Sequence, residues 1–225
     1  MSGDSENKTP PKPIQIPAFD PRNSGEFAAR VLAKVGVDGV LIGRLAIWAW
    51  VPDSGKHRFT KDVDLAVLPA ELADLRATVR AEKLATRELP IGGFAVRLPN
   101  PIDPADEAGE IRVDFIDRTN LEWGDFGDVV AAAILDARQT GQRARLGRAE
   151  LLVVSPSWLV ILKLLSGRGK DDEDIKDLLR MVDVDVPFIR TQFQRFTNLA
   201  GLRTRFEEAL VAMGHRAARR DDGES

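Results

Sequence analysis

The sequence predicts an α/β protein, with a small mixed sheet and flanking helices followed by a helical C-terminal half. Residues 62–67 and 110–117 alternate between apolar and polar side chains with a period of two, which is typical of half-buried strands. From Ser155 and Pro156, which are favoured at a helix start, to about residue 213 the chain has a helical pattern. We therefore expect the sheet before the helical half.

Composition limits the possible classes of protein. The 225 residues suffice for one large domain or two small ones, and 44% hydrophobic with 30% charged residues is ordinary for a globular protein. A net charge of −3 argues against non-specific coating of nucleic acid but leaves a local basic patch open. The absence of cysteine excludes disulfides, thiolate zinc sites and a catalytic thiol.

The chain is expected to have four regions. These are a flexible proline-rich tail over residues 1–22, a core over 23–120, a mostly helical region over 121–215 and a charged tail over 216–225. No apolar run has the length of a membrane span, and the N-terminus lacks the apolar segment of a signal peptide. We therefore expect a cytoplasmic protein with no membrane partner.

The first half of the chain alternates between predicted helices and strands. In order, the predicted elements are a helix over 25–35, a strand over 40–42, a helix over 45–50, a strand over 62–67, a helix over 69–84, strands over 91–99 and 110–117, a helix over 129–137 and a short strand over 151–154. The stretch 141–148 is basic and has the composition of a turn. Its arginines, with Arg138, could contact a nucleic-acid backbone or lie in a solvated loop.

Three acids fall on matching faces of two predicted strands. Asp62 and Asp64 point to one side of their strand, and Asp114 points with Arg112 to the side opposite its apolar neighbours. If the two strands are adjacent, the three carboxylates meet and repel one another. A divalent cation such as Mg²⁺ would relieve that repulsion. For an isolated Asp-x-Asp, an exposed strand with solvated acids is the simpler interpretation.

The order of these residues resembles that of a known family. Gly43 after a short strand, then Arg58, Thr60, Asp62 and Asp64 on the next strand and Asp114 on a later one, is similar to the DNA polymerase beta-like nucleotidyltransferase superfamily. The pattern is closest to its minimal bacterial branch, which includes the abortive-infection AbiEii-type toxins. The resemblance implies a nucleotidyltransferase-type sheet in which the three aspartates hold Mg²⁺ or Mn²⁺.

The same resemblance implies a nucleotide-binding role for residues around the acids. Gly43 and Thr60 are carried over as nucleotide-binding residues. Arg58 could hold a phosphate or brace the carboxylates, and Arg44 could offer its guanidinium to the nucleotide or pack at the edge of the core. Arg44 stands where the family usually has glycine or serine, so a side chain occupies a position at which the backbone is normally bare.

A second motif lies in the helical half. Lys163 is the only charge in the apolar stretch 158–165, so its ammonium either reaches water or pairs with an anion. The acids that follow can be explained by the dipole of the next helix, which favours negative charge in its first turn. Lys163, Asp171 and Asp174 are also similar to the late motif of the AbiEii-type branch, which implies contacts to the nucleotide and a catalytic role for the lysine. Asp172 and Glu173 are expected to be solvated.

These motifs support three hypotheses of function. In the first, the protein transfers a nucleoside monophosphate from a nucleoside triphosphate to an acceptor hydroxyl and releases pyrophosphate. The acceptor would be tRNA or another RNA, a protein or a small molecule; the toxin-branch resemblance favours RNA and implies a cognate antitoxin protein as partner. In the second, the protein is a catalytically inactive nucleotide-binding regulatory module of the same fold. The third, a plain scaffold domain, requires all the motifs to be coincidental.

Overall fold

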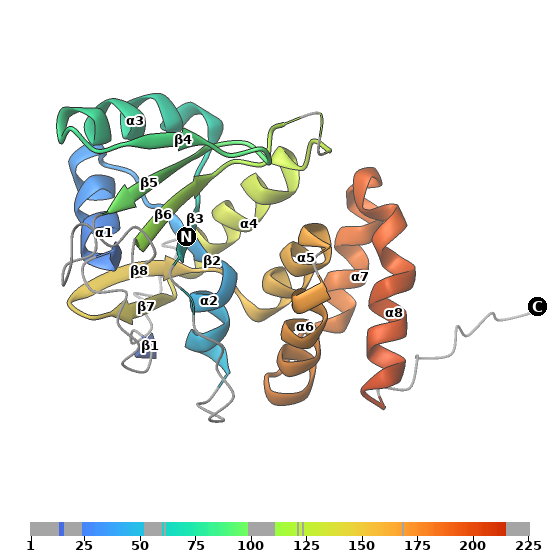
Figure 1. Ribbon diagram of the computed structural model, residues 1–225. Helices are drawn as coiled ribbons and strands as arrows, with labels where there is room; N and C mark the ends of the chain where they lie inside the picture. The colour runs from blue at the N-terminus through green and yellow to red at the C-terminus, as the bar shows by residue number, and fades with distance from the viewer. Residues whose placement is uncertain are drawn as a thin grey trace, which may run out of the picture. The chain divides into compact units, whose positions relative to one another are not determined.

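The protein consists of two compact units. In the computed structural model, residues 14–15, 24–51, 60, 62–98, 111–120, 122, 124–167 and 169–214 are described. The first unit contains the sheet and extends to Ser155, and the second contains the helices from Pro156 onward. The predicted order of a sheet followed by helices is therefore found in the chain (Figure 1).

One mixed sheet forms the centre of the first unit. Its strands are β1 Ile14–Gln15, β2 Val40–Ile42, β3 Asp62–Ala66, β4 Thr86–Glu88, β5 Phe94–Leu98, β6 Ile111–Ile116, β7 Arg143–Leu146 and β8 Ala149–Val153. Their order across the sheet is β1-β7-β8-β2-β3-β6-β5-β4. The pair β3–β6 is parallel, whereas β3 is antiparallel to β2 and β6 is antiparallel to β5. The strands with the three aspartates are thus direct neighbours near the middle of the sheet.

Helices alternate with these strands along the chain. They are α1 Ser24–Val35, α2 Gly43–Trp50, α3 Leu72–Ala81, which follows the short 3-10 helix η1 Pro69–Glu71, and α4 Gly127–Thr140. Helix α1 packs against β6 and β8 and contacts α3, and α4 packs against β2 and β8. The covered strands are accordingly apolar along most of their length.

The alternation in β3 and β6 divides each strand into a buried side and an acidic side. Val63, Leu65, Val113 and Phe115 have no exposed surface, and the Phe115 ring lies 5.1 Å from that of Phe94. Burying a side chain of this kind is worth about 1.5–3 kcal/mol, so the register of these strands is set by their apolar residues. Asp62, Asp64 and Asp114 then lie on the opposite face of their strands, although their negative charges repel one another.

The structure differs from the sequence prediction at one edge of the sheet. The basic stretch expected to form a turn contains β7, which pairs with β8 through a turn at Gly147. Ala144 and Leu146 are buried in β7, whereas Arg145 is exposed, so the stretch alternates like a strand. Residues 14–15, within the predicted tail, pair with Ala144 and Arg145. Part of the region predicted to be mostly helical therefore completes the sheet.

The second unit is helical, as predicted. Its elements are α5 Pro156–Ser166, α6 Gly169–Met181, α7 Val186–Arg195, the 3-10 helix η4 Thr197–Leu202 and α8 Arg203–Ala212. Trp158 lies at its centre, with its ring 5.5 Å from Phe188 and 6.5 Å from Phe196. Asp185 caps α7 by accepting a hydrogen bond from the Phe188 backbone N–H at 2.8 Å. Within the described residues, no helix is long and apolar enough to cross a membrane.

Candidate functional site

The parallel pairing of β3 and β6 brings the three predicted acids together. Asp64 lies directly opposite Asp114, and Asp62 lies opposite Arg112, in the same register. Residues that face each other across neighbouring strands project to the same side of the sheet. We call Asp62, Asp64 and Asp114 the acid group.

Arg112 is part of this arrangement. Its Nη2 donates a hydrogen bond to Asp62 Oδ2 at 2.9 Å. Its Nε lies 2.8 Å from Asp114 Oδ1, a close ion pair that lacks the alignment of a hydrogen bond. One guanidinium therefore holds two of the three acids. Sequence analysis noticed Arg112 only as the neighbour of Asp114, although its position two residues earlier on the same strand face was the available signal.

Asp114 is the most perturbed member of the acid group. It is only 4% exposed, and burial together with the negative charges of Asp64 and Asp62 raises the pKa of Asp114 to about 7. The positive charge of Arg112 acts in the opposite direction but does not offset these effects. An acid held near half-protonation at neutral pH is suited to exchange a proton.

Gly43 lies against the same acids. It has a φ of +69°, a conformation that favours glycine, and it begins α2. A Cβ atom at this position would lie 2.8 Å from Asp64 Cγ and closer still to Asp64 Oδ2. The missing side chain therefore allows the Asp64 carboxylate to approach the first turn of α2, where the helix dipole favours negative charge.

Of the other residues predicted to bind the nucleotide, the structure describes Thr60 and Arg44. Thr60 Oγ1 accepts a hydrogen bond from the Asp62 backbone N–H at 3.3 Å, so Thr60 lies where the chain enters β3. Arg44 is in the first turn of α2 and is partly exposed. Arg58 lies outside the described residues.

The acid group contains the ligand types of a metal site, but its side chains are not arranged around a metal position. Among the residues that the structure describes, no three acidic or histidine side chains are arranged to hold a metal ion as they stand. Two adjacent carboxylates nevertheless fit Mg²⁺, which takes one or two carboxylates together with phosphate oxygens of a nucleotide. The like-charge contact that raises the pKa of Asp114 is one that a cation would relieve. In their chemistry, the donors therefore suit the predicted metal.

Lys163, Asp171 and Asp174 also meet, in the second unit. The Lys163 Nζ donates a hydrogen bond to Asp171 Oδ1 at 2.9 Å and lies 2.8 Å from Asp174 Oδ2. Both acids are 1% exposed and the lysine is 8% exposed. Of the two predicted fates of its ammonium, the structure has pairing with an anion. We call these three residues the lysine triad; it joins α5 to α6.

Two arginines of the second unit are paired with acids of the same unit. Arg205 forms an ion pair with Asp172, and its Nη1 approaches the Leu164 carbonyl at 3.5 Å. Arg190 donates to both carboxylate oxygens of Glu207, at 2.9 and 2.8 Å. The side chain of Asp172 is 48% exposed, in line with the expectation that it is solvated, and it also pairs with Arg205 of α8.

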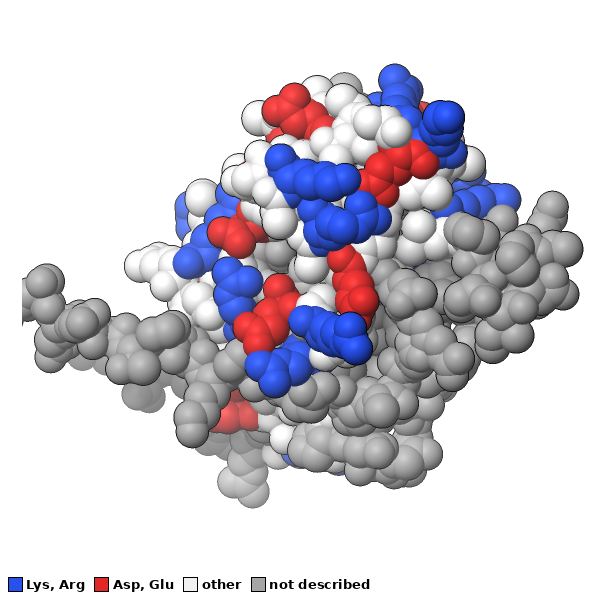
Figure 2. Space-filling model, turned by 90° about the vertical axis from the view of Figure 1, so that its left-hand side faces the viewer, with Lys and Arg blue, Asp and Glu red and all other residues white. Residues whose placement is uncertain are grey.

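The basic residues near β7 do not form a continuous positive surface. Arg138 donates to the Asp38 carbonyl and to Glu71, Arg143 approaches Asp38, and Arg145 pairs with Glu150. Figure 2 shows positive and negative side chains interspersed on the face of the molecule that it displays. The nearby acids reduce the attraction of these arginines for a nucleic-acid backbone.

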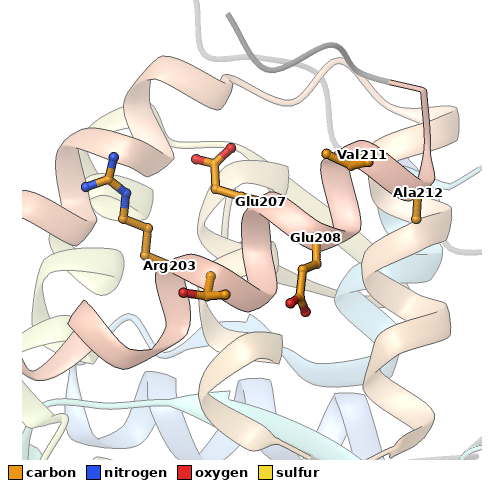
Figure 3. A pocket seen from close by; sticks show the side chains of 6 residues that line it. Arg203, Glu207, Glu208, Val211 and Ala212 are labelled. Carbon is orange, nitrogen blue, oxygen red and sulfur yellow. The ribbon is translucent and has the colours of Figure 1, made fainter. Parts of the chain in front are cut away.

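A shallow hollow lies on the surface of α8 in the second unit. It is lined by Arg203, Thr204, Glu207, Glu208, Val211 and Ala212 (Figure 3). Glu207 is already bound to Arg190, and none of the predicted site residues lines this hollow. It has no chemical feature that indicates a ligand.

Comparison with solved structures supports the fold. An antigenic nucleotidyltransferase-like protein from Paracoccidioides brasiliensis superposes with a TM-score of 0.52 and 18% identity, covering 87% of this chain and 92% of that chain. This likeness shows a nucleotidyltransferase-like α/β fold, as the sequence predicts. The antibiotic-resistance factor ANT(2'')-Ia aligns at a TM-score of 0.36 and 12% identity, over 85% of this chain and 97% of that one, which is too low to support an argument. The sequence matches no protein-family model and no curated protein.

Proposed function

We propose that this protein is a nucleotidyltransferase dependent on Mg²⁺ or Mn²⁺, which transfers a nucleoside monophosphate from a nucleoside triphosphate to an acceptor hydroxyl. The observation that carries the proposal is the pairing of β3 with β6. It places Asp64 opposite Asp114, and Asp62 lies two residues before Asp64 on the same face of β3. These strands lie in a fold of the nucleotidyltransferase-like kind. A bound metal would neutralise the acids and the triphosphate and stabilise charge on the attacking and leaving oxygens.

Each residue of the acid group has its own part in this proposal. Asp62 and Asp64 would hold the metal, and the triphosphate would bind beside Gly43. Asp114 would complete the metal site and accept the proton of the acceptor hydroxyl. The acceptor oxygen then forms a bond to the α-phosphorus, and the bond from that phosphorus to the pyrophosphate oxygen breaks.

The acceptor and the partner belong to the finer part of the proposal. We take RNA, including tRNA, as the first acceptor to test and a cognate antitoxin protein as the partner to seek, both from the resemblance to the AbiEii-type branch. Arg44, Arg58 and Thr60 are proposed to contact the nucleotide. For Lys163, Asp171 and Asp174 the same proposal requires their ion pairs to open, and their burial favours a role in holding α5 to α6.

The test is transfer of label from each of the four ribonucleoside triphosphates, labelled at the α-phosphate, onto total RNA and onto protein. Wild-type protein is expected to transfer label only with Mg²⁺ or Mn²⁺. Asp64→Asn is expected to reduce transfer by about 10²-fold or more, because a group that stabilises transition-state charge is lost. Asp74→Asn, which removes an exposed acid of α3, is the matched control and should keep full activity. Equal transfer by both variants would contradict the proposal.

One observation favours the inactive regulatory module as a second candidate. Arg112 already supplies a positive charge to Asp62 and Asp114, and the described residues include no finished three-ligand metal site. A module without turnover would bind a nucleoside triphosphate in calorimetry yet transfer no label to any acceptor. Binding that Asp64→Asn abolishes, without transfer, would favour this candidate over the enzyme.

A further inference from the structure

Two rows of side chains cross the sheet at the acid group. One row consists of Asp62 on β3, Arg112 on β6 and Arg97 on β5, and the next consists of Asp64, Asp114 and Ala95. All lie on one face, because residues paired across neighbouring strands share a face. The acids of both rows are therefore within reach of the first arginine, Arg112.

Arg112 is placed as a clamp. Its Nη2 is 2.9 Å from Asp62 Oδ2 and its Nε is 2.8 Å from Asp114 Oδ1, so one planar group contacts one acid from each row. The side chains of Arg112 and Asp62 are 34% and 38% exposed, whereas that of Asp114 is 5% exposed. An arginine fork suits two carboxylates in this way because its donors are fixed in one plane.

We propose that Arg112 is a positioning residue that acts as a built-in counter-cation and competes with the divalent metal for Asp62 and Asp114. This inference rests on the proposed function, since it assumes that these acids are metal ligands. A carboxylate oxygen that contacts the guanidinium cannot at the same time bind a metal as strongly. Metal binding therefore requires at least one contact of Arg112 to break. The metal-free protein thus keeps its acids together without a bound ion.

We therefore expect that the divalent metal binds weakly in the absence of nucleotide and that removal of the Arg112 guanidinium increases the affinity for the metal. The test is isothermal titration calorimetry of Mn²⁺ into wild type and Arg112→Met, which retains an unbranched apolar stem. The variant is expected to bind Mn²⁺ about ten-fold more tightly or better, because one positive charge in contact with the ligands is lost. Arg112→Gln, a neutral side chain that still donates hydrogen bonds, serves as the second variant if Arg112→Met does not fold.

A matched control separates the contact from general charge. Arg97→Met removes the same charge from β5, one strand further from Asp62 in the same row. It is expected to change the Mn²⁺ affinity by less than about three-fold, since exposed charges are screened by solvent. An equal gain from Arg97→Met would overturn the proposal, because net charge and not the clamp would then limit binding.

The remaining outcomes are equally decisive. Unchanged or weaker Mn²⁺ binding by folded Arg112→Gln would overturn the inference while leaving the metal site of the proposed function intact, because Arg112 would then hold the acids ready for the metal. No Mn²⁺ binding by either wild type or the arginine variants would overturn both. In wild type, the ¹⁵N–¹H signal of Arg112 Nε is further expected to shift on addition of Mg²⁺, and no shift at saturating Mg²⁺ would contradict competition.

Discussion

The acid group and the lysine triad both bring opposite charges into contact, and they differ in balance and exposure. In the lysine triad, two acids that are each 1% exposed close around one buried lysine. In the acid group, three acids face one arginine, and Asp62 keeps a side chain that is 38% exposed. Burial of the carboxyl, together with the negative charges of Asp64 and Asp62, raises the pKa of Asp114 to about 7, and the charge of Arg112 does not offset these effects.

This difference separates a structural arrangement from a functional one. A buried ion group whose members satisfy one another contributes to specific packing between helices. A partly exposed group in which the fold holds like charges together carries repulsion that a ligand can relieve, and groups with perturbed pKa values cluster at functional sites. This contrast supports the proposal that the chemistry belongs to the sheet, and it favours packing as the role of the lysine triad.

The largest expected effect is in the lysine triad. Lys163→Met leaves Asp171 and Asp174 buried without the ammonium, which should lower the free energy of unfolding by about 3–5 kcal/mol. Urea unfolding followed by tryptophan fluorescence measures this loss. Lys176→Met, which breaks the exposed pair with Glu173 on α6, is the matched control and should leave the urea midpoint nearly unchanged, because water screens the pair.

A rescue experiment sharpens this prediction. Asp174→Asn added to Lys163→Met should recover part of the lost stability, because it removes one of the two buried charges that no longer face the ammonium. A loss below about 1 kcal/mol for Lys163→Met would instead mean that the acids reach water, and the triad would then resemble the acid group.

The next effect concerns Asp114 and has the opposite sign. Because its folded pKa of about 7 lies above the ordinary value of 3.8, the folded protein keeps a proton that the unfolded chain has lost between these values. Stability should therefore fall as pH rises through this window. Asp114→Asn removes that fall and should be about 2–4 kcal/mol more stable than wild type at pH 8.

The measurement is urea unfolding in EDTA at several pH values between 5 and 8. Asp74→Asn, an exposed acid of α3, should leave the pH profile of wild type unchanged. Parallel profiles for wild type and Asp114→Asn would show that the acid group is relaxed, and the contrast with the lysine triad would fail.

Sequence analysis could predict the sheet residues of the site because periodicity alone determines them. The two-residue alternation placed Asp62, Asp64 and Asp114 on matching faces, and the structure brings them together. It could not give the partner of Lys163 or of Asp172, because those contacts join residues from different helices. Nor did it predict β7, since a four-residue alternation within a basic stretch is too short to distinguish from a turn.

A smaller effect is expected at Gly43. Gly43→Ala must adopt a φ of +69°, which costs about 1–2 kcal/mol for a residue with a Cβ, and must also move Asp64. Gly141→Ala is a close control, because Gly141 has a φ of +68° but no atom within 4 Å of its added Cβ. We expect both variants to lose similar backbone stability and only Gly43→Ala to lose Mn²⁺ affinity in calorimetry. Equal Mn²⁺ affinities would mean that Asp64 can move without harm to the acid group.

The smallest effect on stability is expected at Arg145, whose ion pair is more exposed than either the acid group or the lysine triad. Its guanidinium pairs with Glu150 on the surface of the β7–β8 hairpin, with side-chain exposures of 49% and 36%. Arg145→Ala should change the free energy of unfolding by less than about 1 kcal/mol, because water screens the pair. Since Glu150 already offsets its charge, the variant should also leave the salt dependence of RNA retention on a filter unchanged. A fall in that slope by about one counterion would identify Arg145 as a phosphate contact and restore the nucleic-acid role of the basic stretch.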